Sequence, residues 1–576
     1  MRQSRRRFFP SPQRPIIMGG RSMNENLHIN STPLLRAWRK QADSAASIET
    51  TGRLLADLGR RLYVVNAGDR LALETACVDA EACEGLVPAL EPQQLGDPAF
   101  LQDYGVRMAY YAGAMANGIN SEDMVIALGR QGLLGFLGAG GLGRERVASA
   151  LARIGAALPQ GPWGVNLLHN PGDAEWEMDV VRLCIRHGVK VVEASAYMNL
   201  SPAIVYWRVA GLFRNGQGGI DIRHRIIAKV SRREVAQHFI HPAPEKMLAR
   251  LVEDGVISTE QAAMAGEVPM ADDITVEANS GGHTDNGVLS CAFPSIAALR
   301  DEIAEARGEA FCIRIGAAGG IGNPQAVYAA FAMGAAYVCT GSINQACMEA
   351  GTSPQVKTLL GRAKTDDVAM APSADMFEIG ARVQVLKGGT MYAMRAQKLY
   401  NLYKQYDGLE DIPAAEIASL ESVIFQKSLP QVWEETRQFF KARGNPKIVE
   451  AAEAHPKKRM ALVFQWYLGQ SSRWAIAGEK TRAVDYQIWC GPAMGAINEW
   501  LRGSPYETVE SRSVVVIADL LMRNAAYLAR LSALKHAGMP VPEALYRYRP
   551  WADNFAPHLM PSSANPSLPI GTVPAA

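Results

Sequence analysis

Eight short apolar segments alternate with helix-like stretches between about residue 101 and residue 350. This alternation is typical of repeated βα units around a parallel sheet, and eight units are enough to close a barrel. We therefore predict an α/β fold, a (β/α)8 TIM barrel over residues 101–354. The predicted strands are Val106–Tyr110, Leu133–Leu137, Trp163–Leu168, Val189–Glu193, Ile226–Val230, Ile274–Glu277, Cys312–Ile315 and Tyr337–Thr340.

The segments on either side of the predicted barrel have different patterns. Residues 1–23 cluster arginines without an apolar signal core, so we expect a disordered basic arm, unless Met18 or Met23 is the true start. Residues 24–100 predict a small N-terminal unit with a β-hairpin formed by Leu62–Val65 and Leu71–Glu74. Residues 355–548 predict a mostly helical region, with one helix over Met376–Gly388, and the proline-rich residues 549–576 predict an irregular tail.

An insertion of about 45 residues separates the fifth and sixth predicted strands. It contains two helical patterns, Glu234–Glu253 and Thr259–Met264. Ligands bind at the carboxyl ends of the strands in TIM barrels. We therefore expect the insertion to lie over those ends and to shape a substrate channel.

Composition excludes several classes of function. The net charge is +2, so nothing favours a nucleic acid or an anionic membrane as a partner. No apolar stretch reaches the ~18 residues that span a bilayer. The eight cysteines include no CxxC pair, which favours a reducing, cytoplasmic location. His238 and His241 are three residues apart but lack an acidic partner at ligand-like spacing, so no metal site is predicted.

Glycine-rich turns follow the seventh and eighth predicted strands. Gly316–Gly322 contains four glycines and precedes Pro324 at a predicted helix start, and Gly341-Ser342 follows the eighth strand. The loops after these two strands commonly bind phosphate in TIM barrels, through backbone N–H groups and a helix N-terminus. A single such loop would favour a tight turn that needs glycine. Two loops after consecutive strands favour a phosphate site.

Another glycine-rich run, Gly138–Gly143, resembles a dinucleotide-binding fingerprint because it follows a strand and precedes a helix. A Rossmann unit would place an acidic residue at the end of the next strand. That strand ends instead in Asn166-Leu167-Leu168-His169. We reject the dinucleotide interpretation and expect these glycines to make room near the barrel mouth for a planar ring.

The run Glu277–Asn286 follows the sixth predicted strand and carries the chemistry. Gly281 and Gly282 let a flat ligand approach the main chain closely, and His283 comes directly after them. A lone histidine is usually a satisfied core or surface residue, and only its glycine context makes His283 a candidate proton donor. Lys229 and Glu193 end the fifth and fourth strands; a cofactor contact and a structural ion pair both remain open for them.

Several of these motifs occur together in one known family. Gly164–Leu167, Ser280–His283, Ala318–Ile321 and Thr340–Ser342 resemble the flavin-dependent barrels that contain nitronate monooxygenases and small enoyl-acyl-carrier reductases. Longer runs extend the resemblance over nearly the whole chain to the PfaD-type trans-acting enoyl reductases of polyunsaturated fatty acid and polyketide synthases. These runs are Tyr111–Met115, Gly138–Leu142, Glu193–Leu200, Glu277–Asn286 and Phe464–Gly469.

The resemblance implies FMN as the cofactor and NADPH or NADH as the hydride donor. The implied substrate is an enoyl thioester carried on an acyl carrier protein, with His283 giving a proton to the α-carbon. A homodimer is compatible with this, and a nitronate monooxygenase or a non-catalytic synthase subunit are the alternatives. The implied phosphate contacts are Gly319, Gly320, Gly341 and Ser342, and the implied ring contacts are Gly113, Ala114, Asn166, Lys229, Ser280, Gly281 and Gly282.

One position departs from the family pattern. Relatives of this type often carry an acid immediately before Ser-Gly-Gly-His, whereas this chain has Asn279. Asparagine cannot ionise, so it cannot support a charged histidine. Glu277 and Asp285 are the nearby carboxylates that could take over this role. The four tryptophans Trp466, Trp474, Trp489 and Trp500 are expected to be helix core rather than binding residues.

Overall fold

The computed structural model describes residues 45–66, 71–76, 83–170, 172–308, 313–442, 445–539 and 541–549. The predicted basic arm, the turn of the predicted hairpin, Cys312 and the predicted tail beyond Arg549 lie outside the described residues. Within the described part of the chain, no helix has the length and apolar character needed to cross a bilayer.

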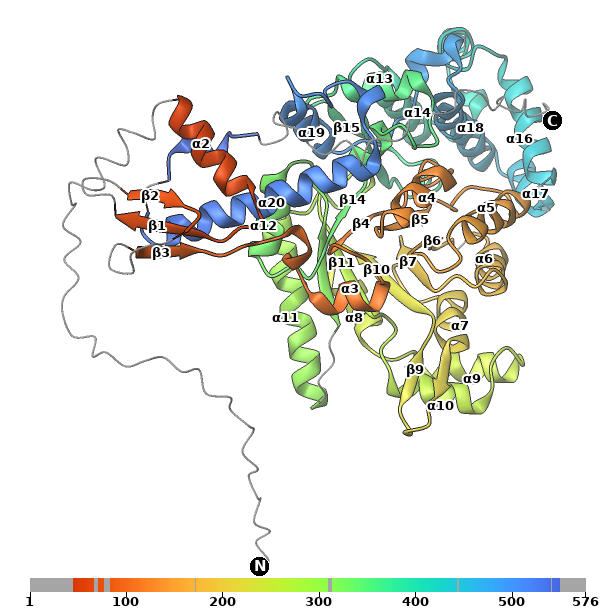
Figure 1. The fold of residues 1–576 in the computed structure, drawn as a ribbon. Coiled ribbons are helices and arrows are strands. Elements are labelled where there is room, and N and C mark those ends of the chain that lie inside the picture. The colour runs from red at the N-terminus through yellow and green to blue at the C-terminus, as the bar shows by residue number, and fades with distance from the viewer. Residues whose placement is uncertain are drawn as a thin grey trace, which may run out of the picture.

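Eight parallel strands close into a barrel, which confirms the predicted fold (Figure 1). Neighbouring strands follow the order β10-β11-β13-β14-β4-β5-β6-β7. The first strand begins at Tyr110 rather than at the predicted Val106, because only Tyr110–Ala112 pair with the neighbouring strands. The strands are β4 (Tyr110–Ala112), β5 (Leu134–Leu137), β6 (Gly164–Leu168), β7 (Val191–Ser195), β10 (Arg225–Val230), β11 (Asp273–Glu277), β13 (Arg314–Ala318) and β14 (Val338–Thr340).

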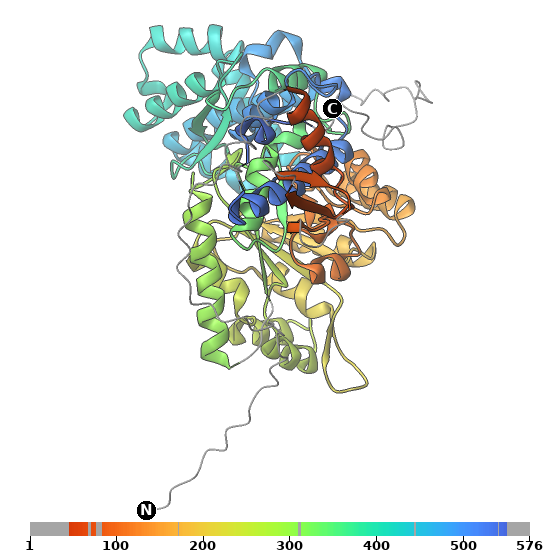
Figure 2. The ribbon, with the colours of Figure 1, turned by 60° about the vertical axis from the view of Figure 1, so that its left-hand side comes forward.

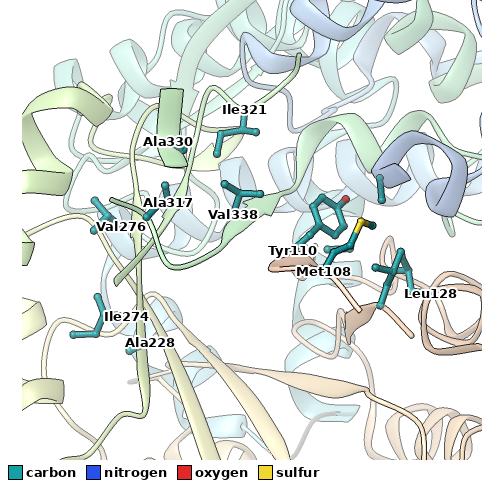
Figure 3. Close-up of a cluster of buried hydrophobic side chains, with 14 of the residues drawn as sticks. Met108, Tyr110, Leu128, Ala228, Ile274, Val276, Ala317, Ile321, Ala330 and Val338 are labelled. Carbon is teal, nitrogen blue, oxygen red and sulfur yellow. The ribbon is translucent and has the colours of Figure 1, made fainter. Parts of the chain in front are cut away.

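Side chains alternate between the two faces of these strands and form two cores. Tyr111, Phe136 and Tyr337 fill the barrel interior, where Tyr111 contacts both other rings. The outward-facing residues pack against the surrounding helices; Figure 3 shows members of this outer cluster, including Ile274 and Val338. The filled interior means that a ligand site can form only at the rim of the barrel.

Helices cover the outside of the barrel, and the last position is filled from far along the chain. α20 (Val514–His536) packs against α12 and α4. In a TIM barrel, the helix that follows the eighth strand lies between these two neighbours, so α20 takes that helix's place. Almost all of α20 is buried, as expected for a helix with apolar residues on every side. The other covering helices are α4 (Glu122–Arg130), α5 (Arg144–Ala157), α6 (Ala174–Arg186), α7 (Pro202–Ala210), α8 (Arg233–Ile240), α11 (Leu289–Arg307) and α12 (Pro324–Ala332).

The N-terminal residues form a three-stranded antiparallel sheet beside α20 (Figure 1). Buried Arg530 of α20 donates hydrogen bonds to the carbonyl oxygens of Leu55, Asp57 and Arg60. These contacts tie α20 to the end of the first described helix. The elements are α2 (Ala45–Ala56), β1 (Leu62–Asn66), β2 (Leu71–Glu74), β3 (Cys83–Val87) and, leading into the barrel, α3 (Pro98–Tyr104).

The insertion between β10 and β11 does not lie over the carboxyl ends of the strands, so that prediction was wrong. Its helices α9 (Glu245–Glu253) and α10 (Thr259–Glu267) both pack against α7. Helix α10 also contacts the strand β8 (Leu212–Arg214). This strand pairs with β9 (Ile220–Ile222) in the segment before β10. Helix α8 has already returned the chain to the amino ends of the strands. Figures 1 and 2 show α9 and α10 at the end of the molecule opposite the C-terminal helices.

The C-terminal region contains a small sheet that the sequence analysis missed. β15 (Val368–Pro372) and β16 (Arg382–Leu386) are strands, so the predicted helix over Met376–Gly388 was wrong. β16 also pairs with the two-residue strand β12 (Gly282–His283), which gives the order β12-β16-β15. The helices of this region are α13 (Pro354–Gly361), α14 (Tyr392–Gln405), α15 (Ala414–Ser419), α16 (Leu429–Ala442), α17 (Pro446–Ala454), α18 (Pro456–Ala477), α19 (Ala493–Leu501) and α21 (Glu543–Tyr546).

Candidate active site

A cavity opens at the carboxyl ends of the barrel strands, where TIM barrels bind their ligands. About 660 Å³ of space, part of it open to solvent, lies between its lining residues. Nine of the eleven predicted cofactor contacts line it; Asn166 and Gly282 do not. The predicted contacts in the lining are Gly113, Ala114, Lys229, Ser280, Gly281, Gly319, Gly320, Gly341 and Ser342.

The loops after β13 and β14 form one side of the cavity. Gly319 and Gly320 have φ angles of +85° and +72°, a left-handed conformation that favours glycine. No atom lies within 4 Å of the position that a Cβ would take on Gly320 or Gly341, so open space adjoins both backbones. Helix α12 starts directly after the first loop, at Pro324. The backbones of Gly320 and Gly341 therefore adjoin the cavity, and the helix N-terminus lies three residues beyond Ile321 of the lining, an arrangement that suits phosphate.

Another part of the cavity lining comes from the C-terminal region, in the segment Trp489–Ala493. We call this segment the roof. The Gly491 N–H donates to Ser342 Oγ at 3.1 Å, and Gln345 Nε2 donates to the Trp489 carbonyl oxygen at 2.7 Å. Trp489, Gly491 and Ala493 all line the cavity. The expectation that Trp489 is helix core was therefore wrong, because it precedes α19 and pairs with β16 through Val385.

We expect a side chain at Gly491 to displace the roof. A Cβ there would lie 2.8 Å from the Gly281 nitrogen and 2.9 Å from the Ser280 carbonyl carbon, and a backbone cannot yield as a flexible side chain does. Gly491→Ala should lower the free energy of unfolding by about 1–3 kcal/mol, the usual cost of overpacking. Gly469→Ala in helix α18 is the control, because nothing lies within 4 Å of its Cβ position and it should stabilise by up to about 1 kcal/mol. Urea unfolding of both variants would measure the change in the free energy of unfolding. Equal midpoints for the two variants would contradict the expected displacement of the roof.

Lys229 and Glu277 line the floor of the cavity, and Glu193, which is not part of the lining, lies beside Lys229. Lys229 Nζ lies 3.7 Å from Glu193 Oε1 and 3.6 Å from Glu277 Oε1. Glu193 is fully buried; its Oε2 accepts a hydrogen bond from the Ala114 N–H, but its Oε1 has no hydrogen-bond partner among the described residues. Burial raises the pKa of Glu193 despite the attraction of Lys229. Burial opposes the charge of Lys229, but the two carboxylates outweigh it and raise the pKa of the amine, which stays protonated.

The glycines after β5 have a different role from the one predicted. A Cβ on Gly138 would lie 1.8 Å from the carbonyl oxygen of Met115, and one on Gly141 would lie 2.0 Å from Asn117 Oδ1. The loop after β4 therefore packs directly on this run, and no residue of Gly138–Gly143 lines the cavity. The glycines make room for the main chain of that loop, not for a planar ring. They act on the site indirectly, because the same loop carries Gly113 and Ala114.

Two further predicted contacts, Ser280 and Asn166, differ in what they can offer a ligand. Ser280 lines the cavity, and its buried Oγ has no hydrogen-bond partner among the described residues. A hydroxyl left in this state favours a ligand that accepts or donates a hydrogen bond. Asn166 lies below the cavity, where its Nδ2 donates to Ser195 Oγ at 2.9 Å and to the Glu193 carbonyl oxygen.

His283 lies two residues beyond Gly281 of the lining and does not itself line the cavity. Its Nε2 is 3.0 Å from Ser373 Oγ and 3.2 Å from Asp375 Oδ1. Burial opposes its charged form, but the hydrogen bond and charge of Asp375 outweigh burial and raise the pKa of His283. Neither partner is predictable from the sequence pattern, because both follow β15, a strand in a region predicted to be helical. Among the described residues, no group of three His, Cys, Asp or Glu side chains is arranged to hold a metal ion.

Comparisons with known proteins agree with this architecture. A model of the nitronate monooxygenase family matches residues 108–388. A model of the inserted helical domain of [acyl-carrier-protein] S-malonyltransferase matches residues 406–486. Among curated proteins, the chain is 48% identical to a polyunsaturated fatty acid synthase subunit from Thraustochytrium sp., over 79% of this chain and 31% of that protein. It is 44% identical to polyketide biosynthesis protein PksE of Bacillus subtilis, over 76% of this chain and 56% of that protein.

The chain thus spans less than two thirds of the length of these curated relatives. A solved structure matches more completely. The enoyl reductase domain of MlnA, from the macrolactin biosynthesis cluster of Bacillus amyloliquefaciens, is 39% identical with a TM-score of 0.74. The match covers 77% of this chain and 99% of that domain. The chain therefore belongs to the PfaD-type enoyl reductases of polyunsaturated fatty acid and polyketide synthases, within the nitronate monooxygenase family.

Proposed function

We propose that this chain is an FMN-dependent enoyl reductase that acts in trans on enoyl thioesters carried by an acyl carrier protein. The observation that carries the proposal is the cavity between two glycine loops and the roof, in a chain that is 39% identical to a solved enoyl reductase domain. The family supports an oxidoreductase, and relatives named as synthase subunits support a carrier-bound substrate. The electron donor is NADPH or NADH.

The residues of the cavity fit FMN. The open backbones of Gly320 and Gly341, with Ser342 and the start of α12, suit the phosphate group. Ser280 Oγ, which lacks a hydrogen-bond partner among the described residues, suits the polar edge of a flavin ring, and the protonated Lys229 adds a positive charge to the cavity lining. Bound FMN would supply the hydride chemistry that no side chain of the site can perform.

The protein's own part in the reaction is to hold the cofactor, exclude water and deliver a proton. The roof covers the glycine loops and limits access to the cavity from the side of Ser342. Lys229 stays charged between Glu193 and Glu277 and keeps the floor ordered. His283, just beyond Gly281, is the proposed donor of the proton that the α-carbon takes up.

The test is a reaction with defined partners. The purified protein, reconstituted with FMN, is reduced with NADPH under anaerobic conditions and then mixed with a crotonyl-loaded acyl carrier protein. We expect rapid flavin bleaching and a gain of two hydrogens in the mass of the acyl group. In His283→Ala, bleaching should be unchanged and acyl reduction should fall by about 10²–10⁴-fold, the usual contribution of a general acid.

Two other results would overturn the proposal. Oxidation of an alkyl nitronate in air, without reduction of the crotonyl group, would indicate a nitronate monooxygenase. A protein that stays colourless after incubation with FMN would indicate a non-catalytic member of a synthase. Full acyl reduction in His283→Ala would remove the proton-donor role alone and leave the flavin-dependent activity in place.

A further inference from the structure

Asn279 stands immediately before Ser-Gly-Gly-His, and its side chain is already engaged. Its Oδ1 accepts a hydrogen bond from Gln384 Nε2 at 2.7 Å, and the same amide nitrogen donates to the Ser280 carbonyl oxygen at 2.7 Å. Gln384 lies on β16, so Asn279 links the end of β11 to the small C-terminal sheet. It serves this link and not the charge of His283.

Neither of the two nearby carboxylates, Glu277 and Asp285, is hydrogen-bonded to His283. Glu277 is paired with Lys229 at 3.6 Å in the floor of the cavity. Asp285 accepts hydrogen bonds from Arg232 at 2.5 Å and 2.9 Å, and from Ser231 Oγ at 2.5 Å. Lys229 thus neutralises the charge of Glu277, and Arg232 and the Ser231 hydroxyl bind Asp285. The partner of His283 therefore has to come from elsewhere in the chain.

The small sheet supplies that partner. His283 of β12 is opposite Val383 of β16, and Val383 is opposite Ala371 of β15. Ser373 and Asp375, in the segment that follows β15, contact the imidazole of His283. Buried Ser373, held by its N–H bond to the Ala381 carbonyl oxygen at 2.9 Å, donates its hydroxyl to Asp375 Oδ1. The same Oδ1 lies 3.2 Å from His283 Nε2.

Only one ring nitrogen of His283 is used in these contacts. Ser373 and Asp375 both meet Nε2, whereas Nδ1 makes no hydrogen bond to any residue that the structure describes. The side chain of His283 is 42% exposed, so the ring is accessible. This arrangement, a carboxylate on one nitrogen and a free second nitrogen, orients an imidazole for proton transfer.

We propose that Asp375 is the positioning residue of His283: it accepts the Nε2–H, fixes the orientation of the imidazolium, and leaves the Nδ1–H as the proton to be transferred. The inference rests on the proposed function. Bound FMN and the reduced nicotinamide would supply the hydride that the β-carbon takes up, and the α-carbon would then carry the added electron pair. The Nδ1–H bond then breaks as the α-carbon–hydrogen bond forms, and the pair of electrons left on Nδ1 makes the imidazole neutral.

The charges around the pair support this role. Glu277 at the end of β11 also favours the protonated ring, whereas the charge of Asp285 is offset by Arg232. Buried Tyr392 of α14 faces Asp375; burial raises its pKa well above the ordinary value, so it is neutral. Burial opposes the charged form of Asp375, but His283 and Ser373 outweigh it and lower its pKa to about 2. Asp375 is therefore ionised across the pH range in which His283 titrates.

The test follows the titration of His283 by NMR in the full-length protein, with His283→Gln to assign the signal. We expect Asp375→Asn to lower the pKa of His283, because burial is then opposed by Glu277 alone. Asp285→Asn is the matched control and should leave the titration unchanged. If Asp375→Asn and the wild-type protein titrate alike, the pair does not exist and the proposal is overturned.

Kinetics of the FMN-reconstituted enzyme give the second measurement. In Asp375→Asn, acyl reduction at pH 8 should fall by about tenfold, and its basic limb should move to lower pH. Flavin reduction by NADPH should be unchanged, and Asp375→Glu should restore part of the activity. An altered titration with unaltered acyl reduction would show that Asp375 only anchors the ring. Acyl reduction retained in His283→Gln would instead refute the proton-donor role, while the titration would still report on the pair.

Discussion

Alanine at Gly319 should weaken FMN binding by at least about 100-fold, equivalent to about 2.7 kcal/mol. Gly319 lines the cavity at a φ of +85°, a conformation that costs other residues about 1–2 kcal/mol. Its Cβ would also lie 2.6 Å from the carbonyl carbon of Ala278, so the loop after β13 would have to move away from the end of β11. The measurement is the flavin absorbance retained per protein after reconstitution and dialysis against graded FMN concentrations.

Gly334→Ala is the matched control for this experiment. Gly334 has a φ of +93°, but no atom lies within 4 Å of its Cβ position and it is outside the cavity. It therefore carries the backbone strain without the displacement of the loop. We expect Gly334→Ala to lower the free energy of unfolding slightly and to retain FMN. Equal FMN affinity in the Gly319 and Gly334 variants would refute the assignment of the loop after β13 to the phosphate.

Methionine at Lys229 should lower the free energy of unfolding by about 3 kcal/mol at neutral pH, the cost of leaving one member of a buried ion pair alone. Lys229 is the cation beside Glu193, which is fully buried and has one oxygen without a hydrogen bond to any described residue. The comparison is the double variant Lys229→Met with Glu193→Gln, in which no buried charge is left at that position. We expect the double variant to recover much of the free energy of unfolding that Lys229→Met loses.

The loss of unfolding free energy in Lys229→Met should also depend on pH. Burial already raises the pKa of Glu193, and removing Lys229 raises it further. A carboxyl whose pKa is higher in the folded state favours folding below its ordinary pKa, and this contribution is lost as the pH rises through the folded value. Urea unfolding of the ligand-free protein at pH 5 and pH 8 should therefore show the greater loss at pH 8. Equal losses at both pH values would mean that Glu193 is not the group left uncompensated.

The predictable part of the fold is the part that local chemistry determines. Each barrel strand is a short apolar run between turn signals, and a strand buried on both faces needs little else to be recognised. The loops after β13 and β14 were recognisable because glycine at φ angles such as +85° and +72° is demanded by the backbone itself. The same local logic failed at Gly138, because a glycine that admits the main chain of another loop has the same sequence signature as one that admits a ligand.

The parts that could not be predicted depend on contacts between distant segments. The apolar run of β16 has the length of a strand but lies among helical patterns, and only its pairing with β12 and β15 decides its state. The roof and Asp375 join the site from more than 90 residues beyond His283, and neither has a motif of its own. Helix α20 was recognisable as a buried helix, but its place between α12 and α4 was not.

The sequence alone therefore determined the barrel, its ligand-binding rim and the glycine loops, because these follow from apolar spacing and from backbone angles that one residue type permits. Only the tertiary structure decided which groups complete the site. The partner of His283, the charge balance around Lys229 and the roof depend on distances between side chains from segments far apart in the chain. Those distances are set by how the whole molecule packs, and local sequence does not encode them.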